Sequence, residues 1–93
     1  MDFDWDPQKA AKNLRKHKVS FGEAATVFSD PLSVTVSDPD HSDDEDRYII
    51  VGMSQQSRLL IVSFAERGDL VRVISARKLT RSERQAYEEK NRE

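Results

Sequence analysis

Acid–base side chains and a group of arginines define the chemistry that this sequence can carry. His41, Glu45 and Arg47 fall close together, and Arg72 and Arg77 follow within one stretch further along the chain. RNA cleavage through the ribose 2′-hydroxyl needs a base that removes its proton and an acid that protonates the leaving oxygen. Guanidinium groups stabilise the charge that builds on the phosphoryl oxygens. These residue types therefore fit phosphodiester cleavage in RNA without a metal ion.

A second group of residues near the C-terminus is suited to hold the RNA backbone. It contains three basic side chains and one tyrosine: Lys78, Arg81, Arg84 and Tyr87. Arg84 and Tyr87 are one helical turn apart, so a helix would present them on nearly the same face. We interpret this group as an RNA-binding surface beside the cleavage residues.

Two other interpretations remain open from the residues alone. In the first, Glu45 forms an ion pair across the sheet with Arg72 or Arg77, and the group has only a structural role. In the second, carboxylates and an imidazole bind a divalent cation. The residues of that alternative site are Asp38, Asp40 and His41.

Two short helices are predicted before the candidate residues. Asp6 is a favoured N-cap and Pro7 suits the first helical position, so we expect a helix that ends near His17. The residues predicted on its apolar face are Ala10, Ala11 and Leu14. The S-x-x-E capping box that starts at Ser20 predicts a second helix over residues 21–28.

Three other residues of this region have structural interpretations. His17, as a cation, would favour the negative end of the first helix dipole, so we expect it to cap that helix rather than act in catalysis. Phe3 and Trp5 are expected to be core aromatics rather than platforms on which RNA bases stack.

The remaining elements define the fold class. Period-two patterns and apolar runs predict strands over residues 32–36, 47–53, 58–66 and 70–76. The acidic segment 37–46 is expected to be a loop, and a capping box at Thr80 opens a C-terminal helix to about Lys90. We therefore expect a single α+β domain over residues 1–93, with two N-terminal helices, a four-stranded mainly antiparallel sheet and a C-terminal helix.

Composition limits the class of protein. The chain has 93 residues, no cysteine and a net charge of −2 from 15 basic and 17 acidic residues. Six of the acids lie between Asp38 and Asp46, and without them 15 basic residues face 11 acidic ones, a balance of +4. A near-neutral total therefore does not exclude an RNA partner. The absence of cysteine and of a long apolar run predicts a cytoplasmic protein that is not embedded in a membrane.

The sequence also resembles the BrnT family, the toxin half of the BrnT–BrnA type II toxin–antitoxin systems. The resemblance covers nearly the whole chain as an ordered set of short stretches. They are Phe3-Asp4-Trp5-Asp6-Pro7 with Lys9 and Asn13, Lys16-His17, Val19-Ser20-Phe21, Glu23-Ala24, Phe28 with Asp30-Pro31, His41-Ser42 with Glu45 and Arg47, Gly52, Ser75-Ala76-Arg77-Lys78, Thr80, Glu83-Arg84 and Tyr87. One position departs from the family pattern, because Lys18 stands where a glycine usually ends the first helix. Glycine suits a left-handed helix end, so Lys18 indicates either some strain or a different end of the helix.

The resemblance implies a RelE-like fold and a bacterial ribonuclease that blocks translation in the manner of an mRNA interferase. It also implies neutralisation by a BrnA-type antitoxin, with an antitoxin dimer binding two toxins and carrying the DNA-binding function. No cofactor and no metal are expected. The candidate catalytic residues that it supports are His41, Glu45, Arg47, Arg72 and Arg77.

In the preferred hypothesis, Arg72 and Arg77 clamp the scissile phosphate and either His41 or Glu45 takes the 2′-hydroxyl proton. Arg47 then orients the carboxylate or binds a neighbouring phosphate. The main alternative is a non-catalytic binding module that acts through its partner protein. Direct DNA binding is a weaker alternative, because the sequence contains no helix-turn-helix with a face that reads bases.

Overall fold

The computed structural model describes residues 1–38 and 46–90 of the chain. Two of the predicted catalytic residues, His41 and Glu45, lie outside the described residues. Asp40, which belongs to the alternative cation site, and most of the acidic segment predicted as a loop also lie outside them.

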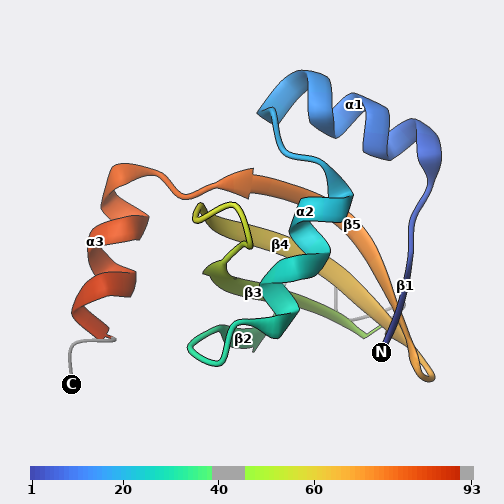
Figure 1. Cartoon of the computed structure of the whole chain (residues 1–93). Helices are drawn as coiled ribbons and strands as arrows, with labels where there is room; N and C mark the ends of the chain where they lie inside the picture. The colour runs from blue at the N-terminus through green and yellow to red at the C-terminus, as the bar shows by residue number, and fades with distance from the viewer. Residues whose placement is uncertain (39–45, 91–93) are drawn as a thin grey trace.

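The elements follow the order that the sequence predicts, with one strand added at the start (Figure 1). Their bounds are β1 Asp2–Asp4, α1 Pro7–His17, α2 Phe21–Thr26, the short 3₁₀ helix η1 Val27–Ser29, β2 Val34–Ser37, β3 Arg47–Met53, β4 Leu59–Arg67, β5 Leu70–Lys78 and α3 Arg81–Lys90. The predicted capping residues act as expected at α1, where Asp6 accepts a hydrogen bond from the Gln8 backbone at 2.8 Å.

The sheet has five strands in the order β1-β5-β4-β3-β2, so the predicted count of four is wrong. Strand β1 pairs with β5 in parallel, whereas the other three pairings are antiparallel, which makes the sheet mixed. The sequence does not reveal β1 because three residues are too few to establish a period-two pattern. The pairing of β1 depends on Leu70 and its neighbours, far away in the chain.

Helix α2 and η1 cover one face of the sheet, which carries the core. Figure 1 shows α2 in front of the strands, with α1 lying above β5 and α3 beyond the end of β5. The core between these helices and the sheet includes Val19, Phe21 and Val27 from the helical side and Ile50, Leu60, Val62, Phe64 and Val73 from the strands. Phe3 packs edge-to-face on Phe28 at 5.1 Å, and Trp5 does the same on Phe21 at 6.0 Å. Both are therefore core aromatics, as predicted.

Helix α1 packs against β5 through a polar residue. Asn13 is buried, and its amide nitrogen donates to the carbonyl oxygens of Val19 at 2.9 Å and Ala76 at 2.8 Å. The backbone N–H of Ala76 in turn donates to the Asn13 side-chain oxygen at 3.1 Å. Both backbone groups of Ala76 thus point away from β4, and Asn13 takes the place that a neighbouring strand would occupy.

The predicted apolar face of α1 is therefore partly wrong. Leu14 is 50% exposed and Ala11 is also exposed, whereas Ala10 packs against the core. The inner face of the helix follows the spacing of Ala10, Asn13 and His17, because the backbone of Ala76 offers hydrogen bonds that only a polar side chain can complete.

The end of α1 has the left-handed conformation, which is the strained one of the two alternatives that Lys18 left open. Lys18 has φ 61°, and its backbone N–H donates to the carbonyl of Leu14 at 3.0 Å. Lysine carries a β-carbon, so this conformation costs about 1 kcal/mol that glycine would not incur. The Lys18 carbonyl accepts a hydrogen bond from Arg58 at 3.1 Å, which ties the turn to the start of β4.

A buried ion pair fixes α2 to the turn between β3 and β4. Glu23 is only 5% exposed, accepts a hydrogen bond from the Ser54 hydroxyl at 2.7 Å and forms a salt bridge with Arg58. Hydrogen bonding from Arg58 lowers the pKa of the Glu23 carboxyl, against the opposing effect of burial. The carboxylate is thus used in packing and does not complete the predicted capping box, although the Glu23 backbone donates to Ser20 at 3.0 Å.

Candidate active site

The sheet face opposite α2 carries the arginines predicted from the sequence. We call it the open face; its residues are Arg47, Ile49 and Val51 of β3, Ile61, Ser63 and Ala65 of β4, and Arg72, Ser75 and Arg77 of β5. Directly paired residues of neighbouring strands project to the same side of a sheet. Ser75 is exposed, and several of its neighbours on this face are partly exposed. Ala65 is buried, so this face is accessible to a ligand around Ser75 rather than over its whole area.

A β-bulge in β5 places Arg72 and Arg77 on the same face. Positions 72 and 77 differ by five, so a regular strand would point them to opposite sides of the sheet. The register shifts between Ser63 and Phe64, so that Ser63 pairs with Ser75 while Phe64 pairs with Val73. The extra residue in β5 restores the phase, because Arg72 pairs with Ala65 and Arg77 pairs with Ile61. Bulges often re-aim side chains next to functional sites.

Arg47 and Arg72 flank the same residue of the central strand. Ala65 pairs with Arg47 on one side and with Arg72 on the other. Neighbouring strands lie about 4.8 Å apart, so the two arginine backbones are separated by roughly 10 Å. Arg72 also contacts Asp4 of β1, with Nη1 at 3.1 and 3.2 Å from the two carboxylate oxygens.

Arg77 lies further along the open face and is held by α3. Its two terminal nitrogens donate to the Glu83 carboxylate at 2.8 and 3.0 Å, and Nη1 also donates to the Lys78 carbonyl at 3.2 Å. Hydrogen bonding to Glu83 raises the pKa of Arg77. The hydrogen bonds that Glu83 accepts from Arg77 and from the Thr80 backbone N–H lower the pKa of its carboxyl to about 2.

Arg72 and Arg77 lie at separate positions along the open face, and their predicted clamp on one phosphate stays a prediction. Their partners in β4, Ala65 and Ile61, are four residues apart, which corresponds to about 14 Å along the strand. Each arginine is paired with a carboxylate of the described residues, Asp4 for Arg72 and Glu83 for Arg77. Arg72 and Arg77 therefore share a face of the sheet but lie at separate positions on it.

A pocket of about 280 Å³ opens beside Arg77. Its lining comes from α1, β3, β4 and β5 and contains His17, Ile49, Ile61, Ser63, Ser75, Ala76 and Arg77. His17 is thus placed next to one of the predicted catalytic residues. The sequence contains a signal for this placement, since His17 follows Asn13 by four positions and shares the inner face of α1 with it.

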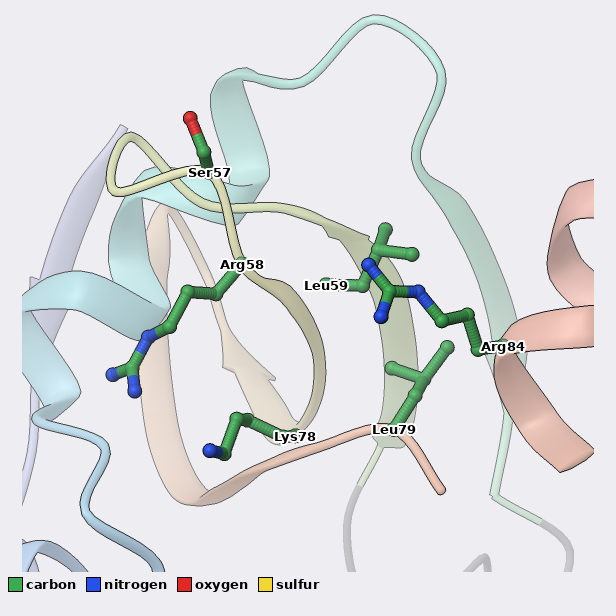
Figure 2. Close-up of a pocket in the computed structure, with 6 residues that line it drawn as sticks. All are labelled: Ser57, Arg58, Leu59, Lys78, Leu79 and Arg84. Atoms are coloured by element: carbon green, nitrogen blue, oxygen red, sulfur yellow. The ribbon is translucent and has the colours of Figure 1, made fainter. Parts of the chain in front are cut away.

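The residues predicted to bind RNA are separated from this pocket. Lys78 follows Arg77 in β5 and projects to the other side of the strand, where it lines a second pocket of about 160 Å³ with Arg58 and Arg84. Figure 2 shows Arg84 reaching from α3 towards Leu59 and Leu79. Arg81 is exposed at the start of α3.

Tyr87 links α3 to the segment before β2. Its hydroxyl donates to the Leu32 carbonyl at 3.0 Å. Both residues line a groove with Asp30, Met53 and Arg84. Tyr87 thus has a structural contact of its own, and it does not line the pocket that contains His17.

Among residues 1–38 and 46–90, no group of three or more histidine, cysteine or acidic side chains gathers as a candidate metal site. Within the same residues, no helix combines the length and apolar character needed to cross a membrane.

The fold and the site define the class: a small α+β protein with a pocket that contains Arg77 and His17 on the open face of a mixed sheet. The sequence matches, over residues 5–83, the family described as "Ribonuclease toxin, BrnT, of type II toxin-antitoxin system". The chain therefore belongs to the BrnT family of ribonuclease toxins, which implies an antitoxin protein as partner and RNA as target. No curated protein matches the sequence.

A solved structure shares this architecture. It is the 1.1 Å-resolution crystal structure of the Brucella abortus ribonuclease toxin, BrnT, which aligns with a TM-score of 0.65 and 24% sequence identity. The alignment covers 87% of this chain and 99% of that chain. The small α+β fold is thereby confirmed, whereas the RelE-like arrangement stays a prediction.

Proposed function

We propose that this chain is a metal-independent endoribonuclease that cleaves mRNA, blocks translation in the cytoplasm and is neutralised by a BrnA-type antitoxin. The observation that carries the proposal is the gathering of Arg47, Arg72 and Arg77 on the open face, beside a pocket that also contains a histidine. Guanidinium groups supply paired donors to phosphate oxygens, and their charge does not depend on pH in the neutral range.

The three arginines have different roles in this proposal. Arg77 lines the pocket and would stabilise the charge on the scissile phosphate as the 2′-oxygen attacks. Arg47 and Arg72 flank Ala65 further along the face and would hold neighbouring phosphates of the same strand. In this proposal the two arginines of the predicted clamp act on different phosphates, because their side chains are held by separate carboxylates.

The basic face of α1 supports binding of a polyanion. Its lysines and arginine are exposed: Lys9, Lys12, Arg15, Lys16 and Lys18. The helix ends at the pocket, through His17. An RNA strand that enters the pocket would therefore pass close to exposed positive charge.

The test is induction of wild type, Arg77→Ala and Glu83→Gln in cells, with growth and RNA integrity as readouts. Glu83→Gln is the matched control, because it removes the same ion pair and keeps the guanidinium group. We expect growth arrest and RNA cleavage with wild type and Glu83→Gln but neither with Arg77→Ala. Purified wild type that cleaves equally with and without EDTA would support metal independence.

One observation favours a second candidate, a non-catalytic module that acts only through its protein partner. Arg72 and Arg77 already hold carboxylates, as residues with a structural role would. Equal growth and intact RNA in wild type and Arg77→Ala, together with tight binding of the partner protein, would favour this candidate over the nuclease.

A stoichiometry of two toxins on one antitoxin dimer, with DNA bound only by the antitoxin, belongs to the same proposal. Light scattering of the purified complex measures the stoichiometry. A gel shift obtained with the complex but not with the isolated toxin would support DNA binding by the antitoxin.

A further inference from the structure

The end of α1 delivers one side chain into the pocket on the open face. Arg15, Lys16 and Lys18 are exposed, whereas His17 is partly buried and lines the pocket with Arg77. The imidazole is therefore held against the sheet, while the neighbouring basic side chains extend into solvent. This arrangement differs from a histidine that only caps a helix, because the backbone N–H of Lys18, not the imidazole, satisfies the last-turn carbonyl of Leu14.

The position of His17 is fixed relative to Arg77 through one buried residue. Asn13 lies one turn before His17 on the same side of α1 and makes three hydrogen bonds to the backbone of Val19 and Ala76. Ala76 immediately precedes Arg77 in β5. The register of the helix is thereby linked to the strand that carries the arginine, which is the rigid placement that proton transfer requires.

The chemistry of the pocket matches a ribose with its 3′-phosphate. In the part of the chain that the structure describes, Arg77 uses three of its five N–H donors for Glu83 and Lys78, so two remain for a phosphate. The Ser63 and Ser75 hydroxyls can donate to ribose or phosphate oxygens, and Ile49 and Ile61 form an apolar wall. Apolar walls with a few convergent polar groups are typical of ligand sites.

We infer that His17 is the general base of RNA cleavage, an inference that rests on the proposed function. The ring nitrogen of an imidazole that carries no proton accepts one from a hydroxyl group. His17 takes the proton of the 2′-hydroxyl while the 2′-oxygen forms a bond to phosphorus. The bond from phosphorus to the 5′-oxygen breaks, and water protonates the leaving oxygen. The products are a 2′,3′-cyclic phosphate and a 5′-hydroxyl.

The experiment measures mRNA cleavage in a reconstituted translation reaction, which contains both free and ribosome-bound RNA. His17→Ala is compared with wild type, with Gln8→Ala and with His41→Gln. Gln8→Ala removes an exposed, uncharged side chain of the same helix, and His41→Gln removes the only other histidine of the chain. Binding is measured separately with a 2′-O-methyl RNA, which cannot be cleaved, and imidazole is added to His17→Ala to test chemical rescue.

We expect His17→Ala to lose about 100-fold or more in cleavage rate, while it binds the 2′-O-methyl RNA as wild type does and regains activity with imidazole. Gln8→Ala should retain cleavage, because its side chain is exposed and lies outside the pocket. Cleavage by His17→Ala within about threefold of wild type, or a loss that imidazole does not restore, would overturn the assignment and leave the proposed function intact. If wild type itself cleaved no RNA, the proposed function and this assignment would both be rejected.

Discussion

Arg72 and Arg77 project from the same face of β5 only because a β-bulge lies between them. The bulge brings Arg77 to the pocket and leaves Arg72 in line with Ala65 and Arg47. Arg47, Arg72 and Arg77 thus form a cationic track over β3 and β5. The small side chain of Ala65 lies between Arg47 and Arg72.

The track predicts how RNA binding depends on salt. Replacing Arg47 or Arg72 with alanine should reduce the slope of log affinity against log salt by about 0.7 for each phosphate that is no longer neutralised. Fluorescence anisotropy with 2′-O-methyl RNA at several salt concentrations measures this slope. Asp4→Asn is the matched control, because it removes the partner of Arg72 and retains the guanidinium. An unchanged slope in both arginine variants would contradict the proposed track.

The hydrogen bonds of Asn13 predict a large effect of a nearly isosteric change. Asn13→Asp retains an oxygen for the Ala76 N–H but loses the donor to the carbonyls of Val19 and Ala76. We expect a loss of about 3 kcal/mol in the free energy of unfolding, because two buried acceptors are left without a partner. Urea denaturation measures the loss, with Lys12→Ala on the exposed side of the helix as control. A loss below about 1 kcal/mol would show that the bonds are dispensable.

The Glu23–Arg58 pair predicts strong coupling between two substitutions. Arg58→Met should cost about 3 kcal/mol, because it leaves the Glu23 carboxylate buried without its counter-charge. The double variant Glu23→Gln/Arg58→Met should be less destabilised than the sum of the two single variants. Arg15→Met, on the exposed side of α1, is the control. Additive effects in a double-mutant cycle would argue against a coupled pair.

The contacts of Glu83 predict a loss of stability in acid. Its pKa falls from the ordinary value of 4.5 to about 2, chiefly through hydrogen bonding to Arg77. The folded chain then binds fewer protons here than the unfolded chain between these values, so stability decreases as pH falls from about 4.5 to about 2. Because both side chains are more than a third exposed, solvent screening reduces the effect to about 1 kcal/mol.

The measurement for Glu83 is thermal unfolding of wild type and Glu83→Gln across this pH range. The variant should be less stable than wild type above about pH 5, and the difference should vanish towards pH 2. A difference that stays constant with pH would mean that the carboxylate does not contribute through its charge.

The helix end at Lys18 predicts a stabilising substitution. Lys18→Gly should raise the free energy of unfolding by about 0.5 kcal/mol, because glycine adopts positive φ without strain and this gain exceeds its greater entropy in the unfolded chain. The carbonyl that accepts from Arg58 belongs to the backbone and is retained. Lys18→Ala separates the effect of charge from that of the β-carbon, since it should not be stabilised. A more stable alanine variant would assign the effect to charge instead.

Local signals predict most elements of this fold correctly, and non-local pairing accounts for the differences. Asp6, Ser20 and Thr80 mark the starts of the helices, and each accepts a hydrogen bond from the expected backbone N–H or its neighbour. Strand β1 and the bulge in β5 depend on which distant residues pair, which no short window of sequence contains.

The candidate site is predictable in its residue types but not in its geometry. In a regular strand, residues five positions apart lie on opposite faces of the sheet. The shared face of Arg72 and Arg77 therefore cannot be predicted without the bulge. The helix dipole alone predicts a capping role for His17, but the docking of Asn13 on Ala76 turns it towards the sheet. For His41 and Glu45, the predicted proton-transfer roles stay predictions.

Asn13 also has a consequence for the behaviour of the chain among other copies of itself. A strand with free backbone groups along its edge can recruit extended segments from other molecules. In β5, β1 pairs with Leu70 to Arg72, and the Asn13 amide occupies both backbone groups of Ala76. An incoming strand would have to detach α1 before it could continue the ladder. Asn13 therefore protects this edge of β5 from intermolecular strand pairing. A variant that lacks its hydrogen bonds to Ala76 should form intermolecular β-sheet under conditions in which its hydrophobic core is still folded.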